Sequence, residues 1–496
     1  MRTRTRTRTA AGVVAAVTAV LTLPAVPASA SPPAASAPSA TTAATATTAS
    51  DFNGDGYADL AVGVPEGAVD GRARAGYVSV LWGGAQGVGA HGGTRISQAT
   101  AEVPGVPEAG DRFGSAVALV DTSGDGVAEL LVGAAGEDVG SFTDAGSVTA
   151  VAGARGGTRP GSVVATGPAA SAAYGLSVAS ADLTGDGGRD IVVGGRGKVV
   201  ARTADGVFVT VVTDHMGDRA PVLATGDFDD DGTADLAVGY WSTAPHIRSH
   251  VRLYAWDPAE QALLNFWNTD NAGVSALASG DFDGDGSDDL ALGECREIAD
   301  ENIDDPCGPE EFSGGGGIHL HYGSAGTGWF GSRRQTLGQD TAGVAGVAED
   351  GDRFGAALAV ADVNADGRDD LLAGAPGEAI GTRAGAGAST LLFGGPAGLV
   401  DAWGGGRSVA LHQGTPDVPG AAETGDAFGA AVATGDHDGD GRADLAVGAP
   451  GENAGSGGVW LLPRAGAAGS AAVTPGRIGL PSPSSALSYG RYVHSR

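Results

Sequence analysis

The stretch Asp281-Phe282-Asp283-Gly284-Asp285-Gly286-Ser287-Asp288-Asp289-Leu290 carries a ten-residue pattern, D-x-[DNST]-x-D-G-x-x-[DE]-[LI], that occurs seven times in the chain. The copies begin at Asp51, Asp121, Asp182, Asp227, Asp281, Asp362 and Asp436. Oxygen-bearing side chains stand at positions one, three, five and nine, and position six is always glycine, which permits a sharp turn. Alternating oxygens in a tight loop converge on one point, as the ligands of a hard cation do. The repetition therefore predicts up to seven calcium loops.

Each loop is expected to bind its ion through the side chains at positions one, three, five and nine and through the backbone carbonyl at position seven. The predicted ligands are Asp51, Asn53, Asp55, Tyr57 and Asp59; Asp121, Ser123, Asp125, Val127 and Glu129; Asp182, Thr184, Asp186, Gly188 and Asp190; Asp227, Asp229, Asp231, Thr233 and Asp235; Asp281, Asp283, Asp285, Ser287 and Asp289; Asp362, Asn364, Asp366, Arg368 and Asp370; Asp436, Asp438, Asp440, Arg442 and Asp444. Because hydroxyls stand at position three in the second and third loops, these two are expected to bind calcium most weakly.

The EF-hand is the obvious alternative, but its loop closes with a bidentate Glu at position twelve and lies between helices. Here position twelve is always apolar, at Val62, Val132, Val193, Val238, Leu292, Ala373 and Val447. The flanking segments are short, Val-rich and bounded by glycine, as in residues 113–120 and 130–133. Such runs are typical of buried strands. Each loop is therefore expected to join two β-strands.

Composition narrows the class of protein. Acidic residues outnumber basic ones by 59 to 29 in 496 residues, which argues against nucleic acid or an anionic membrane as a partner. The 87 glycines follow no three-residue period, which excludes collagen.

The amino terminus has the pattern of an export signal. Four arginines up to Arg8 precede an apolar run from Ala10 to Leu23, and Ala28-Ser29-Ala30 is a cleavage sequence. The apolar run is short for a bilayer span, and no transmembrane segment is expected. We expect a signal peptide over residues 1–30, a flexible Ala/Ser/Thr/Pro-rich linker over 31–50, and a secreted or cell-surface protein. In an exported chain, Cys295 and Cys307 are expected to form a local disulfide.

Two further motifs recur at fixed distances from the loops. Phe113-Gly114, Tyr174-Gly175, Phe354-Gly355 and Phe428-Gly429 each lie eight residues before a loop. Gly-Ala-Ala-Gly-Glu at 133–137 and Gly-Ala-Pro-Gly-Glu at 374–378 and 448–452 follow three of them. The spacing of the loops fits one four-stranded propeller blade per copy.

In this order the motifs resemble FG-GAP repeats, as in the amino-terminal β-propeller of integrin α subunits. The resemblance covers residues 51–496 and is strongest in blades two, six and seven. Blades four and five depart from it, with Arg219-Ala220 and Gly273-Val274 in place of Phe-Gly. It implies an all-β fold, a seven-bladed propeller of four-stranded blades.

The first loop is preceded by no Phe-Gly segment, whereas Leu487 to Val493 near the carboxy terminus resembles residues 173–178. We expect this segment to supply the first strand of blade one, so that the two ends of the propeller pair and close the ring. The alternative is that residues 43–50 form that strand.

The resemblance also implies that partners bind on the face opposite the calcium loops, as in integrins. The longest connection expected there runs from Glu294 to Gly317 and is either a binding loop or a solvated insertion. His319 and His321 alternate on a strand, as zinc ligands do, but two surface histidines are the simpler interpretation.

The main functional hypothesis is a recognition or cell-adhesion module for an extracellular protein or glycan. The alternatives are a structural protein of the cell envelope and an extracellular hydrolase or lyase built on the propeller. No G-x-S-x-G, H-E-x-x-H or G-x-x-x-x-G-K-[ST] motif occurs, so no catalytic residue is assigned and an enzyme is not expected.

Overall fold

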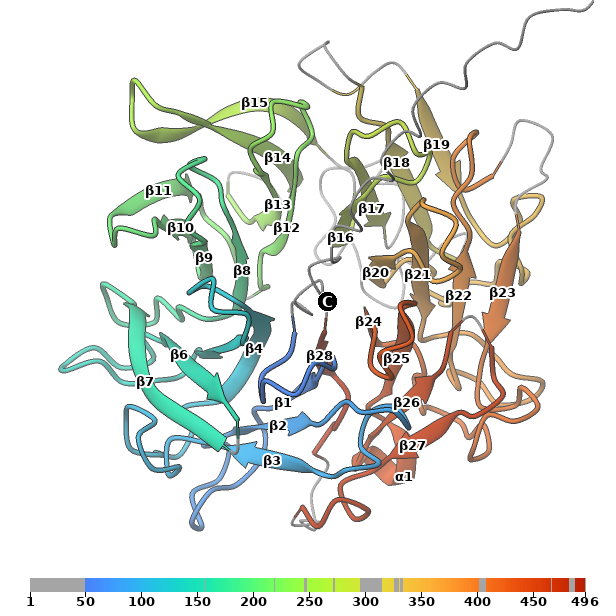
Figure 1. Ribbon diagram of the computed structural model, residues 1–496, viewed down its shortest axis with the longest axis horizontal. Helices are drawn as coiled ribbons and strands as arrows, with labels where there is room; N and C mark the ends of the chain where they lie inside the picture. Colours follow the sequence, from blue (N-terminus) through green and yellow to red (C-terminus); the bar gives the residue numbers. More distant parts are fainter. Residues whose placement is uncertain are drawn as a thin grey trace, which may run out of the picture. The chain divides into compact units, whose positions relative to one another are not determined.

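Seven four-stranded antiparallel sheets form the blades of a β-propeller (Figure 1). The computed structural model describes residues 50–155, 157–217, 219–244, 248–270, 273–294, 315–324, 330, 333–400, 407–464, 466–480 and 487–495. The first strand of each blade contacts the first strands of its two neighbours, so the blades close into a ring. The predicted fold class is confirmed.

The strands follow one another from the centre of the ring outward in every blade. Blade one contains β28 (Tyr492–His494), β1 (Leu60–Val64), β2 (Tyr77–Leu81) and β3 (Gly93–Ile96). Blade two contains β4 (Phe113–Val120), β5 (Glu129–Ala134), β6 (Ser147–Ala154) and β7 (Gly157–Thr166). Blade three contains β8 (Ser177–Ala181), β9 (Asp190–Gly195), β10 (Lys198–Arg202) and β11 (Phe208–Thr213). Blade four contains β12 (Val222–Gly226), β13 (Asp235–Ser242), β14 (Arg248–Asp257) and β15 (Ala262–Asp270).

Blade five contains β16 (Val274–Gly280), β17 (Asp289–Glu294), β18 (Gly317–His321) and β19 (Arg334–Leu337). Blade six contains β20 (Ala357–Ala361), β21 (Asp370–Ala375), β22 (Ala388–Leu392) and β23 (Ser408–Leu411). Blade seven contains β24 (Ala431–Gly435), β25 (Asp444–Ala449), β26 (Gly458–Leu462) and β27 (Ala471–Val473). A single short turn, α1 (Glu452–Gly455), lies between β25 and β26.

The second strand of each blade is apolar almost throughout because it is covered on both faces. In β1, β17, β21 and β25 every residue is buried. A strand between two sheets loses the alternation of polar and apolar residues, which explains the continuous Val, Leu and Ala runs. In blades two to seven the predicted calcium loop joins the first strand to this second strand, and in blade one the loop beginning at Asp51 leads into the second strand, β1.

The carboxy-terminal strand closes the ring. Strand β28 pairs antiparallel with β1, with Val493 opposite Val62. Tyr489, four residues upstream, is fully buried and its hydroxyl donates to the Ser79 hydroxyl at 3.3 Å. The predicted pairing of the two ends of the propeller is confirmed, and no open edge remains on β1.

The Phe-Gly motif links each blade that carries it to the blade before. Phe428 forms a parallel bridge to Gly387, and Phe113, Tyr174, Phe354 and Tyr489 form the same bridge to an earlier glycine. The glycine that follows needs its left-handed backbone, since Gly429 has φ of +90°. A Cβ on Gly374 would lie 1.9 Å from the Gly429 carbonyl oxygen, so the two backbones approach too closely for a side chain. Tyr489-Gly490 is thus the seventh blade's contact with blade one.

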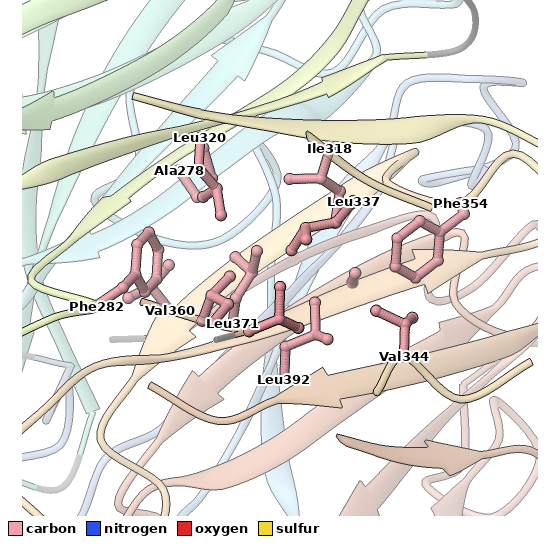
Figure 2. Packing of buried hydrophobic residues seen from close by; sticks show 14 of the residues in the cluster. Ala278, Phe282, Ile318, Leu320, Leu337, Val344, Phe354, Val360, Leu371 and Leu392 are labelled. Atoms are coloured by element: carbon pink, nitrogen blue, oxygen red, sulfur yellow. The ribbon is translucent and has the colours of Figure 1, made fainter. Parts of the chain in front are cut away.

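The cores lie between neighbouring blades. Figure 2 shows the one between blades five and six, where Ile318 and Leu320 of β18 meet Leu371 of β21. Phe354, from the Phe-Gly motif of blade six, packs in the same cluster and is fully buried. The inner strands surround a cavity of about 960 Å³, and six of them place alanine there: Ala118, Ala179, Ala224, Ala278, Ala359 and Ala433. Small side chains at these positions allow the strands to converge on the axis.

Candidate functional site

We call the seven ten-residue segments the calcium loops after their predicted ligand, and in each the carboxylate at position one organises the backbone. In the first loop, Asp51 Oδ1 accepts the N–H groups of Gly54 and Asp55 at 2.6 and 3.1 Å, and its Oδ2 accepts that of Gly56 at 2.7 Å. Asp121 and Asp281 make the same three contacts, and the first Asp of each other loop accepts from positions five and six. These hydrogen bonds hold the loop in a curve around the carboxylate.

Three loops bring three acidic side chains within 4.8 Å of one another. The groups are Asp227, Asp229 and Asp235; Asp281, Asp283 and Asp285; and Asp436, Asp438 and Asp440. These are the loops that have Asp at position three. In the other four, position three is Asn53, Ser123, Thr184 or Asn364, and the described residues there form no such group of acids. The residue at position three therefore divides the loops into two classes, because the loops with Asp there carry one acidic ligand more than the others.

Position nine is more deeply buried than its role as a ligand requires. Asp59 has no exposed surface; its Oδ2 accepts from Phe52 and Asn53, and its Oδ1 accepts from Gly83 at 2.8 Å. Asp190, Asp289, Asp370 and Asp444 make the corresponding bond to the residue two positions after the third strand. Position nine thus ties the loop to the end of the third strand, in addition to its predicted role as a ligand. Among the predicted ligands, it is the one whose structural role the sequence pattern did not reveal.

Burial opposes the charged form of these carboxylates. It raises the pKa of Asp59 and Asp370 to about 7, of Asp235 and Asp289 to about 8, and of Asp444 to about 6. Repulsion from the carboxylate at position one or three of the same loop adds to the effect. A divalent cation would relieve both costs, because it neutralises the crowded acids and replaces their lost hydration.

The donor set fits calcium. Every side-chain ligand is an oxygen, the position-one carboxylates keep lone pairs beyond those used by backbone N–H groups, and no thiolate or imidazole takes part. Position-five carboxylates accept from the position-seven N–H, as Asp285 does from Ser287 at 3.0 Å, which fixes the turn at the centre of the loop. The ligand sets given above are the residues that would hold the ion.

Two arginines lie against the loops with Asp at position three. Arg333 forms an ion pair with Asp283, and Arg464 forms one with Asp440. Both follow the third strand of the same blade as the loop. Each guanidinium places a positive charge on a predicted calcium ligand and competes with the ion for that oxygen.

At the opposite end of the second strands from the calcium loops, three blade junctions share a set of polar contacts that the sequence analysis did not predict. Gln98 donates to Glu137 at 2.5 Å, Gln339 to Glu378 at 2.5 Å and Gln413 to Glu452 at 2.6 Å. Each glutamate is the last residue of a Gly-Ala-x-Gly-Glu motif and each glutamine belongs to the preceding blade. We call these the Gln–Glu contacts. In all three, the glutamine carbonyl oxygen is buried without a hydrogen-bond partner among the described residues.

A buried aspartate stands beside each Gln–Glu contact. Asp111, Asp352 and Asp426 each accept the N–H of a glutamate three residues earlier, and the backbone carbonyl of each accepts an N–H from the Gly-Ala-x-Gly-Glu turn. Burial, together with the neighbouring glutamates, raises the pKa of Asp111 to about 7 and of Asp352 to about 6. Burial also raises the pKa of Glu137, Glu378 and Glu452. These acids fasten one blade to the next.

The junction of blades four and five is built differently. The indole N–H of Trp241 donates to the Val274 carbonyl at 3.0 Å, and the Ser249 hydroxyl accepts the Gly273 N–H at 2.9 Å. Side chains thus make the link that Phe-Gly makes elsewhere. Beside it, β15 of blade four and strands β17, β18 and β19 of blade five line a cavity of about 240 Å³.

Titratable groups gather at this cavity, which we call the blade 4/5 pocket. Its lining includes Asp270, Glu294, His319, His321 and Arg334. His319 Nε2 lies 2.9 Å from Glu294 Oε2. His321 is 7% exposed, so its interpretation as a surface histidine is wrong. The ring is held between Trp267 and Phe330, with centroids at 4.9 and 5.5 Å.

The predicted loop beyond Glu294, with Cys295 and Cys307, lies outside the described residues, so the disulfide stays a prediction. So do the signal peptide over residues 1–30 and the linker up to residue 49. Among the described residues, no helix is both long and apolar enough to cross a membrane.

These features define the class: a seven-bladed β-propeller with acidic loops between the first and second strands of its blades. Residues 43–81, 113–151, 354–392 and 428–462 match the FG-GAP repeat. The chain thus carries FG-GAP repeats in four places, and its seven-bladed β-propeller is the fold of the integrin α amino-terminal domain. The four matches are blades one, two, six and seven, the ring's regular part.

Two curated relatives share part of the sequence. Phosphatidylinositol-glycan-specific phospholipase D of Bos taurus is 34% identical over 147 residues, which are 29% of this chain and 17% of that protein. The protein of the same name from Rattus norvegicus is 32% identical over 146 residues, again 29% and 17%. The match thus spans less than a fifth of these relatives.

Among solved structures, a chain of the Photorhabdus luminescens Tc holotoxin pore aligns with 76% of this chain and 16% of its own length, at 15% identity. The TM-score is 0.33, too low to support any conclusion about fold or function.

Proposed function

We propose that this chain is a secreted, calcium-binding β-propeller that recognises an extracellular protein or glycan. The calcium loops serve the fold: they lead into the second strand of every blade, connect it to the first strand in blades two to seven, and stiffen one face of the ring. Recognition belongs to the opposite face, where the connections between the second and third strands and between blades emerge.

One observation carries the proposal. Blades four and five lie outside the FG-GAP matches, and their junction holds a polar cavity where the junctions of blades one and two, five and six, and six and seven have a Gln–Glu contact. In a repeat protein each unit needs only to pack on its neighbours. A unit with buried polar groups in place of the packing motifs is therefore a candidate for a role beyond packing, such as ligand binding. Concave sites with a few convergent polar groups are typical of ligand binding.

An exported location fits the basic and apolar amino-terminal segment, and extracellular calcium modules bind at roughly 10⁻⁴–10⁻³ M, which matches calcium outside cells. The two curated relatives are named for an activity on a phosphatidylinositol-glycan. A glycan of that kind therefore belongs among the candidate ligands.

The experiment is capture of ligands by the folded, calcium-loaded protein. The mature chain is presented to an array of glycans, including a phosphatidylinositol-glycan, and to a set of extracellular matrix proteins, once with calcium and once with chelator. The proposal expects calcium-dependent binding to one class. Binding to none by a protein that melts cooperatively would contradict it.

A hydrolase is the second candidate because three side chains in blade four lie in nucleophile–base–acid order. Ser242 Oγ is 2.9 Å from His250 Nε2, and His250 Nδ1 is 2.8 Å from Asp270 Oδ1. However, Ser242 is only 4% exposed, and Arg252 also binds Asp270, at 2.7 Å. The network therefore orients Asp270 better than it activates Ser242. A fluorophosphonate probe is expected to leave Ser242 unlabelled, and labelling would favour the hydrolase.

A further inference from the structure

We propose that the blade 4/5 pocket is a binding site for the hydroxyl groups of one neutral sugar residue. The inference deepens the proposed recognition function and rests on it. It assigns a place and a ligand chemistry to that function.

The walls of the pocket are polar and oriented by neighbours. On the blade-four side, Asp270 accepts from Arg252 and His250 and lies with Thr269 in the lining. On the blade-five side, Glu294 is held by His319, whose Nδ1 lies 3.3 Å from the Thr336 hydroxyl. Carboxylates whose orientation is fixed by other side chains are prepared to accept hydrogen bonds in a defined geometry.

The charges in and around the pocket are balanced. Asp270 and Glu294 face Arg252 and Arg334 from the same two blades. Burial acts to raise the pKa of Asp270, but hydrogen bonds from His250 and Arg252 outweigh it and leave the pKa below its usual value. A site with paired charges offers little net attraction to an anion or a cation and suits a neutral ligand with many hydroxyls.

His321 provides the second, independent observation. Its side chain lines the pocket, is more than nine-tenths buried, and its Nδ1 has no hydrogen-bond partner among the described residues. Burial, followed by the nearby charges of Arg334 and His319, lowers the pKa of His321 to about 4. The imidazole is therefore neutral near pH 7, with one N–H and one lone pair. Unsatisfied buried polar groups are rare, and a ligand is one reason for their presence.

The size and floor of the pocket agree with a single sugar unit. At about 240 Å³ it is smaller than the usual 300–1,000 Å³ of drug-sized sites. Leu292 adds an apolar side chain to the polar groups of the lining. A sugar ring presents the same combination of apolar C–H faces and hydroxyl edges.

A transition metal is the competing occupant, because His319, His321 and Glu294 are possible ligands. Their ligand atoms do not form one of the groups that lie within 4.8 Å of one another among the described residues. The geometry therefore favours hydroxyl binding over a metal centre.

The test uses the full calcium-loaded chain and the methyl glycosides of glucose, galactose, mannose, fucose and N-acetylglucosamine as probes. Saturation-transfer NMR identifies a binder and calorimetry gives its Kd, expected near 1 mM for one sugar unit. Glu294→Gln removes a buried acceptor charge, and Arg334→Ala removes an exposed residue of the lining whose loss should not affect folding. Each is expected to weaken binding about tenfold. Glu137→Gln, the same change at a Gln–Glu contact, is the matched control and should leave the Kd unchanged.

Absence of binding by all five glycosides, with the protein folded, overturns the inference. So does binding that neither pocket variant weakens, and so does zinc binding that the pocket variants abolish. If the array experiment captures a ligand that these variants do not affect, the inference fails while the proposed function stands. If the array captures nothing, the proposed function fails as well.

Discussion

The junctions between blades five and six and between blades four and five solve the same packing problem in different ways. At the first, the backbone of Phe354-Gly355 passes against the preceding blade, a Gln–Glu contact fastens the far face, and Ile318 and Leu320 fill the core. At the second, Trp241 replaces the backbone link, and a polar pocket takes the place of the Gln–Glu contact. The comparison shows that the repeat motifs join neighbouring blades, and that the junction without them is joined by other side chains and leaves room for a polar pocket.

The largest effect is expected where a main-chain link closes the ring. Removing residues 487–496 deletes β28 and exposes the edge of β1. Loss of the fully buried Tyr489 alone costs roughly 3–5 kcal/mol, by comparison with Phe→Ala in cores. Thermal unfolding should show a marked drop in Tm.

Removal of residues 31–46 is the control for this truncation, since residues 43–50 were the alternative source of the strand. The Tm should not change. An equal loss of stability in both truncations would refute the assigned closure.

The next prediction compares a Phe-Gly link with its side-chain substitute. Phe428→Ala leaves a cavity against Trp460 and should lower the free energy of unfolding by about 3–5 kcal/mol. Trp241→Phe removes one hydrogen bond and should cost about 1 kcal/mol. Denaturant titrations measure both.

Phe208→Ala is the control. Because Phe208 is 52% exposed, its loss should change stability by less than about 0.5 kcal/mol. Equal losses at Phe428 and Trp241 would erase the distinction between the two junctions.

The Gln–Glu junctions should make stability fall as the pH rises, which is opposite in sign to the effect of His321 at the blade 4/5 junction, whose lowered pKa makes stability fall as the pH drops. Because burial raises the pKa of Asp111 to about 7 and of Asp352 to about 6, the folded state binds these protons more tightly than the unfolded state. Their contribution to stability is present below about pH 4 and is lost as the pH rises through the folded pKa.

In saturating calcium, which holds the loop carboxylates ionised, Asp111→Asn and Asp352→Asn should each reduce the fall in stability between pH 4 and 7. After allowance for solvent screening the change is on the order of 1 kcal/mol. Glu294→Gln, at the junction of blades four and five, is the comparison variant, and it should leave this fall in stability unchanged. An unchanged pH profile in both Asn variants would show that the raised pKa values do not couple to folding.

The smallest effect concerns the arginines beside the loops. Arg464→Ala removes a positive charge from Asp440 and should tighten calcium binding at the seventh loop by about two- to fivefold at low salt. Calcium titrations of this variant and of Arg477→Ala, an exposed arginine that donates to the Ala472 carbonyl and serves as the control, test it. Weaker binding in Arg464→Ala would mean that the arginine positions the ligand instead of competing with the ion.

The sequence predicted much of this architecture because the repeat is local. The ligand positions and turn glycines recur in each ten-residue loop, and the same apolar strands flank it, so seven copies predict seven blades. The Tyr489-Gly490 segment resembles the Phe-Gly segments of other blades, which predicts the closure of the ring. The roles of Gln98, Gln339 and Gln413 could not be predicted, because each acts on a glutamate in the next blade, 39 residues away. Their shared spacing from that glutamate was the available signal. The pocket at blades four and five has no repeated counterpart, so no internal comparison could point to His321 or Asp270.

The most direct test of the account is a calcium titration of the chelator-stripped chain, with the unfolding curve recorded at each step. The account predicts that bound calcium exceeds one ion per chain, that the loops beginning at Asp227, Asp281 and Asp436 fill first because they hold the most acids, and that Tm rises with occupancy. Asp229→Asn, Asp283→Asn and Asp438→Asn should remove these early sites one at a time. A Tm that ignores calcium, with no ion retained, would contradict the claim that these loops are metal sites supporting the ring.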